Sequence, residues 1–566
     1  MQPLPIPPLD QTLERFIAGV APLLTKDEIN QTKAAATRFQ SHCGELLQQR
    51  LLQFAQQQDE KDISWLTEIK LAAYLQDVRP LALCNNPGMQ LDYPSNDQGL
   101  QRAASFIHRV VRVHIRYLNG EIEQPVDARG QPISMYNWRV LSGALREPLA
   151  EGDRYYYAQS QTANRTISLM WQGHHIALQV TNEEGEVFSV KTLMDALQTI
   201  VDGEYEQPDF DFMALSALGS QKTGAYLEEL CNDPHNQNVY QALRDSLFCL
   251  SLYHSGKNEL EQLHEQTFMP GFAWQYKPFS YQIDLDSDFV CLHFEHSEID
   301  GGALKIIYTT AFEIGLDDQV TGQPGITPLD WVCEEAVSAS IRQDIDAIAS
   351  QARHIQSTIC HIDHSAITTK ISHDAILQFA LIYAQLKVFD QVRLTYEAVD
   401  TSHYKAGRTE AMRPNSREAI ELCQSLLTDN ATKEQLDAAL NMHRKRVIAC
   451  KTGQAYDRHL TGLQMMIRDN DDKDCIHAFF NSPGYQALTG GDFLSTTSMG
   501  NRSPIIRVIF VPTTPGGFGV YYSDDNKEYE FLLTGDQQGS PYLDQLRDGC
   551  IEGANKLIEL VASQAE

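Results

Sequence analysis

A histidine followed four residues later by an aspartate is the first pattern in this sequence with a clear chemical use. His296 and Asp300 lie in residues 294–302, where Gly301 and Gly302 follow the aspartate directly. An imidazole has a pKa near neutral pH and can take a proton from an attacking hydroxyl group. The pattern therefore suits acyl transfer with His296 as the general base. Asp300 is then an orienting residue, although a plain turn-stabilising role explains its position equally well.

Three later segments contain hydroxyl, aromatic and basic side chains in close succession: residues 394–413, 455–460 and 494–498. Taken in order with residues 294–302, they resemble four segments of the carnitine/choline acyltransferase family. Shorter matches at residues 4–13 and 515–522 extend the resemblance over nearly the whole chain. Four matching segments in the same order are difficult to obtain by chance.

The resemblance implies a reaction as well as a fold. It implies reversible transfer of an acyl group between coenzyme A and the hydroxyl group of carnitine, with no acyl-enzyme and no cofactor besides the coenzyme A thioester. Thr497 then supplies the hydrogen bond that stabilises negative charge on the thioester oxygen. The family has a serine at this position. Threonine keeps the hydroxyl group, adds a methyl group and restricts the side-chain rotamer.

Arg458 matters most for the choice of acceptor. A guanidinium can hold a carboxylate through paired hydrogen bonds, and choline has no carboxylate. Carnitine is therefore favoured over choline, although an isolated Arg458 could equally be a surface residue paired with Asp457. The other positions that the resemblance assigns to carnitine are Tyr396, Thr409, Ser495 and Phe510, the last near the trimethylammonium group. Val508 or Arg507 falls where the family sets acyl-chain length.

The segment expected to bind coenzyme A matches the family least well. Family members present two lysines to the 3′-phosphate, but Asp363 and Ile367 stand at those positions, so only Lys370 and Asp374 match. An aspartate facing a phosphate group is electrostatically unfavourable. Three explanations stay open: weaker binding of coenzyme A, a different loop alignment, and a donor without the 3′-phosphate such as an acyl carrier protein.

Two other functions stay open beside a carnitine acyltransferase. One is an acyltransferase of the same fold that uses another small alcohol or a donor other than coenzyme A. The other is a catalytically weakened binding protein that keeps the fold. The presence of His296, Thr409, Arg458 and Ser495 argues against this second alternative, whereas Asp363 and Ile367 argue for it.

The elements that must position these side chains can be predicted from the spacing of apolar residues. Helices are predicted over residues 13–75, 193–200, 334–357 and 542–562, and strands over residues 166–171, 176–180, 289–294, 505–510 and 519–522. The strand over residues 289–294 runs directly into His296, so the histidine is expected at a strand end.

The resemblance implies an α/β fold of two chloramphenicol-acetyltransferase-like domains with an active-site tunnel at their interface. Residues 1–75 are expected to form a helical segment that packs with the second domain. Residues 76–333 are expected to form the first α/β domain, which carries the catalytic histidine. Residues 334–566 are expected to form the second α/β domain, with the acceptor-binding and donor-binding segments.

The composition excludes several classes of partner. Forty-five basic and 75 acidic side chains give a formal net charge of −30, which opposes binding to nucleic acids and anionic lipids. The eleven cysteines include no Cys-x-x-Cys pair, so we expect thiols in a reducing compartment, no disulfide framework and no metal site. The sequence contains no long apolar run, no secretory signal and no peroxisomal tail at residues 563–566. We expect a cytoplasmic protein without a membrane span, and the family resemblance suggests a monomer.

Overall fold

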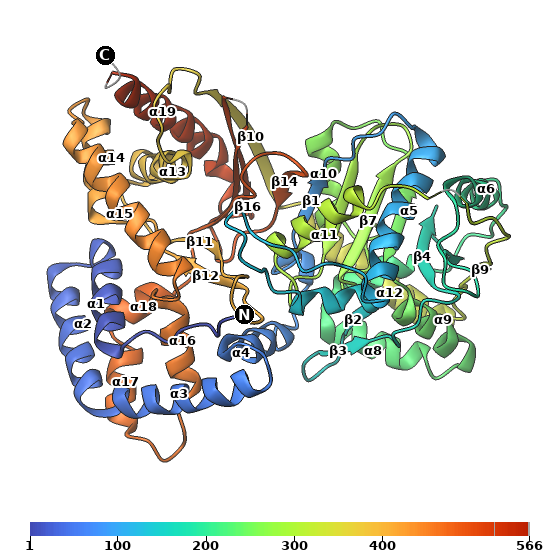
Figure 1. The fold of residues 1–566 in the computed structure, drawn as a ribbon, viewed down its shortest axis with the longest axis horizontal. Helices are drawn as coiled ribbons and strands as arrows, with labels where there is room; N and C mark the ends of the chain where they lie inside the picture. The colour runs from blue at the N-terminus through green and yellow to red at the C-terminus, as the bar shows by residue number, and fades with distance from the viewer. Residues whose placement is uncertain (318, 526, 564–566) are drawn as a thin grey trace.

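The computed structural model describes residues 1–317, 319–525 and 527–563 and contains two large β-sheets with helices packed on them (Figure 1). In the described chain the larger sheet has eight strands, in the order β14 (Ile505–Ile509), β1 (Gly88–Leu91), β8 (Val290–Phe294), β7 (Phe279–Asp284), β6 (Cys249–Tyr253), β4 (Thr166–Trp171), β5 (His174–Gln179) and β9 (Ile326–Pro328). The smaller sheet has six, in the order β10 (Gln356–Asp363), β16 (Glu528–Gly535), β15 (Phe518–Asp525), β13 (Leu494–Thr497), β11 (Thr395–Asp400) and β12 (Thr409–Met412). The predicted α/β class with two sheets is confirmed.

Long amphipathic helices cover the larger sheet. Helix α5 (Gly99–Leu118) packs against both α6 (Val190–Val201) and α11 (Gly301–Glu313). Its apolar side chains join the buried cluster that also contains the strands of this sheet. The remaining elements of this half are α7 (Phe212–Leu215), α8 (Ser220–Leu230), α9 (Pro234–Asp245), α10 (Glu259–Phe268), α12 (Glu335–Ala352) and the ribbon of β2 (Ala144–Glu147) and β3 (Arg154–Tyr157). A continuous apolar core of this size holds the strand that precedes His296 in place.

The smaller sheet packs against α13 (His373–Phe389) and α19 (Leu543–Ala562), which lie close to one another (Figure 1). Gly549 and Gly553 of α19 make this approach possible. A Cβ atom at Gly549 would lie 3.0 Å from the Cα of Ala384, and one at Gly553 would lie 2.8 Å from the ring of Tyr383. Neither position has room for a side chain unless the helices separate. Helices α14 (Arg417–Leu427) and α15 (Lys433–Lys451) complete this layer.

The N-terminal helices form a separate cluster with later helices. They are α1 (Leu9–Val20), α2 (Lys26–Phe39), α3 (Glu45–Glu60) and α4 (Trp65–Leu75), which confirms the predicted helical character of residues 13–75. Their partners are α16 (Asp457–Met465), α17 (Lys473–Phe480) and α18 (Pro483–Thr489), seen at the lower left of Figure 1. The rings of Phe39 and Phe479 stack with centroids 4.2 Å apart, and Phe16 packs edge-on against Phe479.

One predicted element extends too far. The helix predicted over residues 334–357 ends at Ala352, and β10 begins at Gln356. The reason is tertiary: residues 356–363 pair along their whole length with β16, and this long-range pairing is invisible to local periodicity. The short strand β9 at Ile326–Pro328 forms just before the domain boundary expected near residue 333.

Elements cross between the two expected domains. Strand β14 comes from the C-terminal half of the chain but pairs with β1 in the larger sheet. Helix α12 buries Ile341 and Ile348 in an apolar cluster with Leu215 and Trp274, on the larger-sheet side. The expected boundaries near residues 75 and 333 stay predictions. Strand β14 and helix α12 connect the C-terminal half of the chain to the larger sheet.

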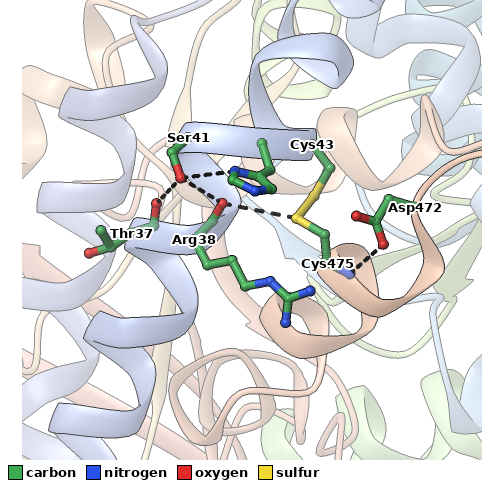
Figure 2. Close-up of a disulfide and its surroundings, with 7 residues drawn as sticks. Thr37, Arg38, Ser41, Cys43, Asp472 and Cys475 are labelled. Atoms are coloured by element: carbon green, nitrogen blue, oxygen red, sulfur yellow. Dashed lines mark hydrogen bonds between the residues drawn. A yellow bond between two sulfur atoms is a disulfide. The ribbon is translucent and has the colours of Figure 1, made fainter.

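A disulfide joins the first and last parts of the helical cluster (Figure 2). Cys43 lies between α2 and α3, Cys475 lies in the first turn of α17, and their Cα atoms are 6.3 Å apart. The expectation that all eleven cysteines are thiols is wrong for this pair, whereas the other nine are free. The partners are separated by 432 residues, so no local spacing could reveal the pair.

Among the described helices, none combines the length and the apolar character that crossing a lipid bilayer requires. The tail at residues 563–566, whose sequence lacks a peroxisomal signal, lies outside the described residues from 564 onward.

Candidate active site

His296 lies just beyond the end of β8, before α11 begins at Gly301. Its Nδ1 is 2.7 Å from the carbonyl oxygen of Ile299. A carbonyl only accepts, so Nδ1 carries the hydrogen and donates it, and Nε2 is left as the basic nitrogen. Burial lowers the pKa of His296 to about 4, against the opposing effect of Asp300. The imidazole is therefore neutral near pH 7, which is the form that a general base requires.

Asp300 occupies a buried position between two cations. The Nε of Arg408 donates to its Oδ2 at 2.7 Å, and the Nζ of Lys70 lies 3.1 Å from its Oδ1. Burial alone would raise the pKa of Asp300, but the charges of Arg408 and Lys70 lower it below its usual value. Its Oδ1 is 3.9 Å from Nδ1 of His296, which is too long for a hydrogen bond. This arrangement is that of an orienting residue and not of a proton relay.

Arg408 fixes the backbone around the histidine. Its Nη2 donates to the carbonyl oxygen of His296 at 2.9 Å, and its Nη1 donates to the carbonyl oxygen of Ser297. Lys70 donates to Oγ1 of Thr409 at 2.8 Å, which ties α4 to the start of β12. Sequence reasoning assigns neither cation to the site. Arg408 directly precedes Thr409 in a matching segment, so a signal existed for it, whereas nothing distinguishes Lys70 from other helical lysines.

A cavity of about 380 Å³ lies beside His296, between the two sheets. Its wall includes every side chain that the sequence predicts for catalysis and carnitine binding: His296, Asp300, Thr497, Tyr396, Thr409, Arg458, Ser495 and Phe510. These residues come from the end of β8, from three strands of the smaller sheet, from α16 and from the segment after β14. Many of the lining residues are polar or charged, and the cavity has the size of a small-molecule site.

Arg458 brings a charge to this cavity that no carboxylate neutralises. Its neighbour Asp457 instead pairs with Arg413 at 2.7 Å, and Arg413 also binds Asp492. Among the described residues Arg458 forms no ion pair, and its Nε has no hydrogen-bond partner. The alternative of a surface arginine paired with Asp457 is therefore wrong. A buried, unpaired guanidinium is unfavourable unless an anionic ligand completes it.

Glu410 lies near Arg458 but compensates the charge of its guanidinium only in part. Its Oε1 accepts a hydrogen bond from the backbone N–H of Arg458 at 3.2 Å. Burial raises the pKa of Glu410 to about 7, although the charge of Arg458 opposes this shift. Near neutral pH this carboxyl group is only partly ionised, so it offsets the charge of Arg458 only in part.

Strand β13 presents two hydroxyl groups to the cavity. It lies between β11 and β15 and runs parallel to both. Because side chains alternate along a strand, Ser495 and Thr497 point to one face and Thr496 to the other. The hydroxyl group of Thr496 is already used, since it donates to the carbonyl of Tyr396 at 2.8 Å and accepts from Gln378 at 2.9 Å. The hydroxyl groups of Ser495 and Thr497 form no hydrogen bond within the described chain and can therefore serve a ligand.

The structure decides between the two candidates for the chain-length position. Val508 of β14 stands opposite Met89 of β1, and both side chains line the cavity. Arg507 is absent from this wall, and its guanidinium binds Glu530 and Glu259, each at 3.0 Å. Val508 is thus the residue of the two that borders the cavity, while Arg507 connects the two sheets.

The two residues predicted to bind coenzyme A lie outside the cavity wall. Lys370 is exposed in the loop between β10 and α13. Asp374 accepts hydrogen bonds from Tyr522 at 2.7 Å and from His443 at 2.8 Å. Burial would raise the pKa of Asp374, but the hydrogen bond from His443 lowers it. Asp374 is thus held by hydrogen bonds at the start of α13, and its predicted contact with coenzyme A stays a prediction.

Two histidines and a carboxylate gather near the same loop. Nε2 of His364 is 2.7 Å from a carboxylate oxygen of Asp524, and Nδ1 of His373 is 3.8 Å from the other. One ligand atom from each residue lies within 4.8 Å of the others, so the group could hold a metal ion. Their present contacts are those of a hydrogen-bonded network, in which His364 also stacks on Tyr529.

Comparison with known proteins agrees with this site. Human carnitine O-acetyltransferase is 22% identical, with 94% of this chain and 88% of the relative covered. Rat peroxisomal carnitine O-octanoyltransferase is 23% identical over 99% of this chain and 94% of its own length. Rat mitochondrial carnitine O-palmitoyltransferase 2 is 24% identical, with 92% of this chain and 86% of the relative covered.

Among solved structures, a trichothecene 15-O-acetyltransferase from Fusarium sporotrichioides superposes with a TM-score of 0.38 at 8% identity, covering 86% of this chain and 93% of that one. The model of the family described as choline/carnitine O-acyltransferase matches residues 4–547, which include the whole cavity wall. The chain belongs to the choline/carnitine O-acyltransferase family.

Proposed function

We propose that this acyltransferase transfers acyl groups reversibly between coenzyme A and the hydroxyl group of L-carnitine. The observation that carries the choice of acceptor is the unpaired guanidinium of Arg458, which lines the same cavity as the basic nitrogen of His296. A zwitterionic alcohol with a carboxylate completes that guanidinium, whereas a choline cation would be repelled by it. The proposal of coenzyme A as donor rests on family membership.

In the proposed reaction, Nε2 of His296 takes the proton of the carnitine hydroxyl group, and the resulting oxygen nucleophile attacks the thioester carbonyl carbon. The carbonyl π electrons move to its oxygen, and the hydroxyl group of Thr497 donates a hydrogen bond to that developing charge. The intermediate collapses, the carbon–sulfur bond breaks, and the thiolate takes the proton from the imidazolium of His296. No metal ion or acyl-enzyme enters this sequence of steps.

The buried environment of His296 supports both halves of this proton transfer. A pKa of about 4 keeps the imidazole neutral before the reaction. The same low pKa makes the imidazolium a strong acid, so it readily returns the proton to the leaving thiolate. Arg408 and Asp300 act by positioning: they hold the loop so that Nδ1–H stays on the carbonyl of Ile299.

A second candidate donor is favoured by one specific observation. Asp363 is exposed at the end of β10 and accepts from the backbone N–H of Ser365, at a position where related enzymes have a lysine for the 3′-phosphate. This surface suits a thioester that lacks the 3′-phosphate. Dephospho-coenzyme A thioesters therefore provide a direct comparison with the corresponding coenzyme A thioesters.

The decisive assay follows free thiol released from acetyl, octanoyl and palmitoyl coenzyme A in the presence of L-carnitine. We expect thiol release with at least one chain length, and release near the background rate for His296→Ala. Background release with every chain length would refute the proposal. Release with another alcohol but not with carnitine would keep the acyltransferase and change the acceptor.

A further inference from the structure

A second cavity, of about 420 Å³, lies outside the catalytic cavity described above. Helix α1 and the turn after it form one side, and α15 together with the first turn of α14 forms the other. The floor includes the end of β12 and Tyr456. At this size the cavity can hold a small molecule.

The charges around this cavity contrast with the charge of the whole chain. Arg15, Arg417, Lys445 and Arg446 line it, and Glu418 is the one carboxylate among the described lining residues. None of these four cations forms an ion pair within the described residues; Arg15 donates to Gln11 and to the carbonyl of Gln454. Four uncompensated cations at one cavity are unexpected in a protein with a net charge of −30, and they attract an anion.

Arg446 lines the cavity with a guanidinium whose hydrogen-bonding groups are only partly used. It is half-buried on α15, and its Nη1 donates to the carbonyl oxygen of Arg413. Its Nε and Nη2 make no hydrogen bond in the part of the chain that the structure describes. Burial lowers the pKa of Arg446, and Tyr456 and the carboxylate of Glu418 oppose this shift only in part.

Tyr456 provides an independent observation. Its hydroxyl group is buried against α1 near Gly19 and has no hydrogen-bond partner among the described residues. Burial raises the pKa of Tyr456 to about 12, so the group is a neutral donor at physiological pH. A buried hydroxyl group without a partner is unfavourable, so this part of the cavity wall is not optimised for stability alone.

Apart from the four cations, Arg413, Glu418 and Tyr456, the described side chains of the cavity wall carry no strongly polar group. It includes Ala18, Pro22, Met442 and Ala449, which offer no hydrogen-bonding group from their side chains. Methionine side chains adapt to irregular apolar ligands. We propose that this cavity binds an amphipathic carboxylate, with its alkyl chain against these residues and its carboxylate held by Arg446 and the neighbouring cations.

The cavity is connected to the catalytic one through Arg413, which lines both. The Arg446 guanidinium binds the carbonyl of Arg413, and the side chain of Arg413 holds Asp457, the residue next to Arg458. An anion bound to Arg446 would therefore change the hydrogen bond to the carbonyl of Arg413. Arg413 lies beside the acceptor site because it pairs with Asp457. We expect the ligand to change the KM for carnitine. This readout rests on the proposed function, whereas a measurement of ligand binding to the second cavity is independent of it.

The test is isothermal titration calorimetry of the whole protein with sodium octanoate, 1-octanol and sodium acetate as probes. Octanoate is expected to bind. Octanol lacks the carboxylate and acetate lacks the alkyl chain, so both are expected to bind at least tenfold more weakly than octanoate. Arg446→Gln and Lys445→Gln remove charge, and Met442→Trp fills the apolar end. Lys451→Gln, which removes an exposed charge at the end of α15 outside the cavity, is the matched control.

We expect octanoate affinity to fall at least tenfold in Arg446→Gln and Met442→Trp, and less in Lys445→Gln, while Lys451→Gln binds like the wild type. Equal affinity for octanoate and octanol, or unchanged binding in Met442→Trp and Lys445→Gln, would overturn the proposal even if Arg446→Gln failed to fold. Loss of binding in Arg458→Gln with retention in Arg446→Gln would place octanoate in the catalytic cavity and also overturn it.

Discussion

At the scale of single residues, the site depends on a neutral imidazole and a charged guanidinium that line one cavity. Burial keeps His296 neutral, and Arg458 forms no ion pair among the described residues. The first is useful for taking up a proton and the second for holding an anion. Residues from distant parts of the chain shape both surroundings, since Arg408 holds the carbonyl of His296 and Arg413 pairs with Asp457.

The low pKa of His296 predicts an unusual pH dependence. A base whose pKa is lowered stays deprotonated until the pH falls to that value, so activity is retained above pH 4 and lost below it. We expect kcat/KM at pH 5 to stay within about twofold of its value at pH 7. An ordinary histidine would lose about 30-fold over the same interval. Initial rates in a constant-ionic-strength buffer, corrected for any unfolding, measure the difference.

Replacing Arg458 tests the choice of acceptor. Arg458→Asn removes the guanidinium that we assign to the carnitine carboxylate, and loss of a charge-assisted hydrogen bond costs about 2–3 kcal/mol. We expect kcat/KM for carnitine to fall about 30- to 150-fold, mainly through KM, while the low rate with choline is unchanged or higher. Lys433→Asn, an exposed cation at the start of α15, is the control. Equal losses with carnitine and choline would remove Arg458 from the acceptor site.

A third residue-scale prediction concerns the loop around the histidine. Arg408→Lys keeps a charge near Asp300 but cannot reach both carbonyl oxygens that Arg408 holds. We expect kcat to fall at least tenfold with little change in the carnitine KM, because the residue positions His296 and does not face the acceptor. An increase confined to KM would contradict this assignment.

At the scale of elements, β14 has the most consequential placement. It belongs to the C-terminal half of the chain but adds an edge strand to the larger sheet beside β1. Arg507 of this strand binds Glu530 of β16, and its neighbour Val508 borders the cavity. The strand therefore connects the sheets and forms part of the substrate wall at once.

The position of Val508 at the cavity wall predicts that this residue limits the length of the acyl chain that the enzyme accepts. Val508→Trp places a large side chain at the cavity wall, which leaves less room for a long acyl chain. We expect the ratio of activity with octanoyl thioester to that with acetyl thioester to fall at least tenfold. Ile506→Trp, two residues away on β14 but outside the cavity wall, is the control. An unchanged ratio in Val508→Trp would show that the acyl chain lies elsewhere.

At the scale of the whole molecule, three long-range connections hold distant segments together. The disulfide ties the N-terminal helices to α17, β14 ties the C-terminal half to the larger sheet, and Lys70 of α4 reaches Asp300. Within a chain of net charge −30, two cavities each contain a guanidinium without an ion pair among the described residues, Arg458 in one and Arg446 in the other. The molecule therefore concentrates positive charge where an anion can be buried.

The disulfide predicts a measurable contribution to stability. Cys43→Ser is expected to lower the free energy of unfolding by about 2–4 kcal/mol, because the cross-link restricts the unfolded chain. Thermal denaturation should show a lower Tm for this variant, and reductant should lower the Tm of the wild type similarly. Cys231→Ser removes a free thiol and serves as control.

Thiol titration checks the cross-link directly. We expect nine reactive thiols in the denatured, unreduced protein and eleven after reduction. Eleven thiols before reduction would show that Cys43 and Cys475 are not bonded in the purified protein.

Several parts of this protein could be predicted because local patterns in the sequence encode them. Apolar periodicity located the strand before His296, the N-terminal helices and the terminal helix, since side-chain spacing reflects the helix or strand period directly. Four short segments identified the acyltransferase family and the side chains that we assigned to catalysis and acceptor binding, except Phe510, which lies just before the shorter match at residues 515–522. The residue types in these segments indicate the reaction without any knowledge of the three-dimensional arrangement.

Only the tertiary structure decided which groups meet. It paired Asp457 with Arg413 and left Arg458 free, chose Val508 over Arg507 for the cavity, and joined two cysteines 432 residues apart. It also converted residues 356–357 from the expected helix to the start of β10. Each of these outcomes depends on contacts between segments far apart in the chain, and local periodicity carries no information about such contacts.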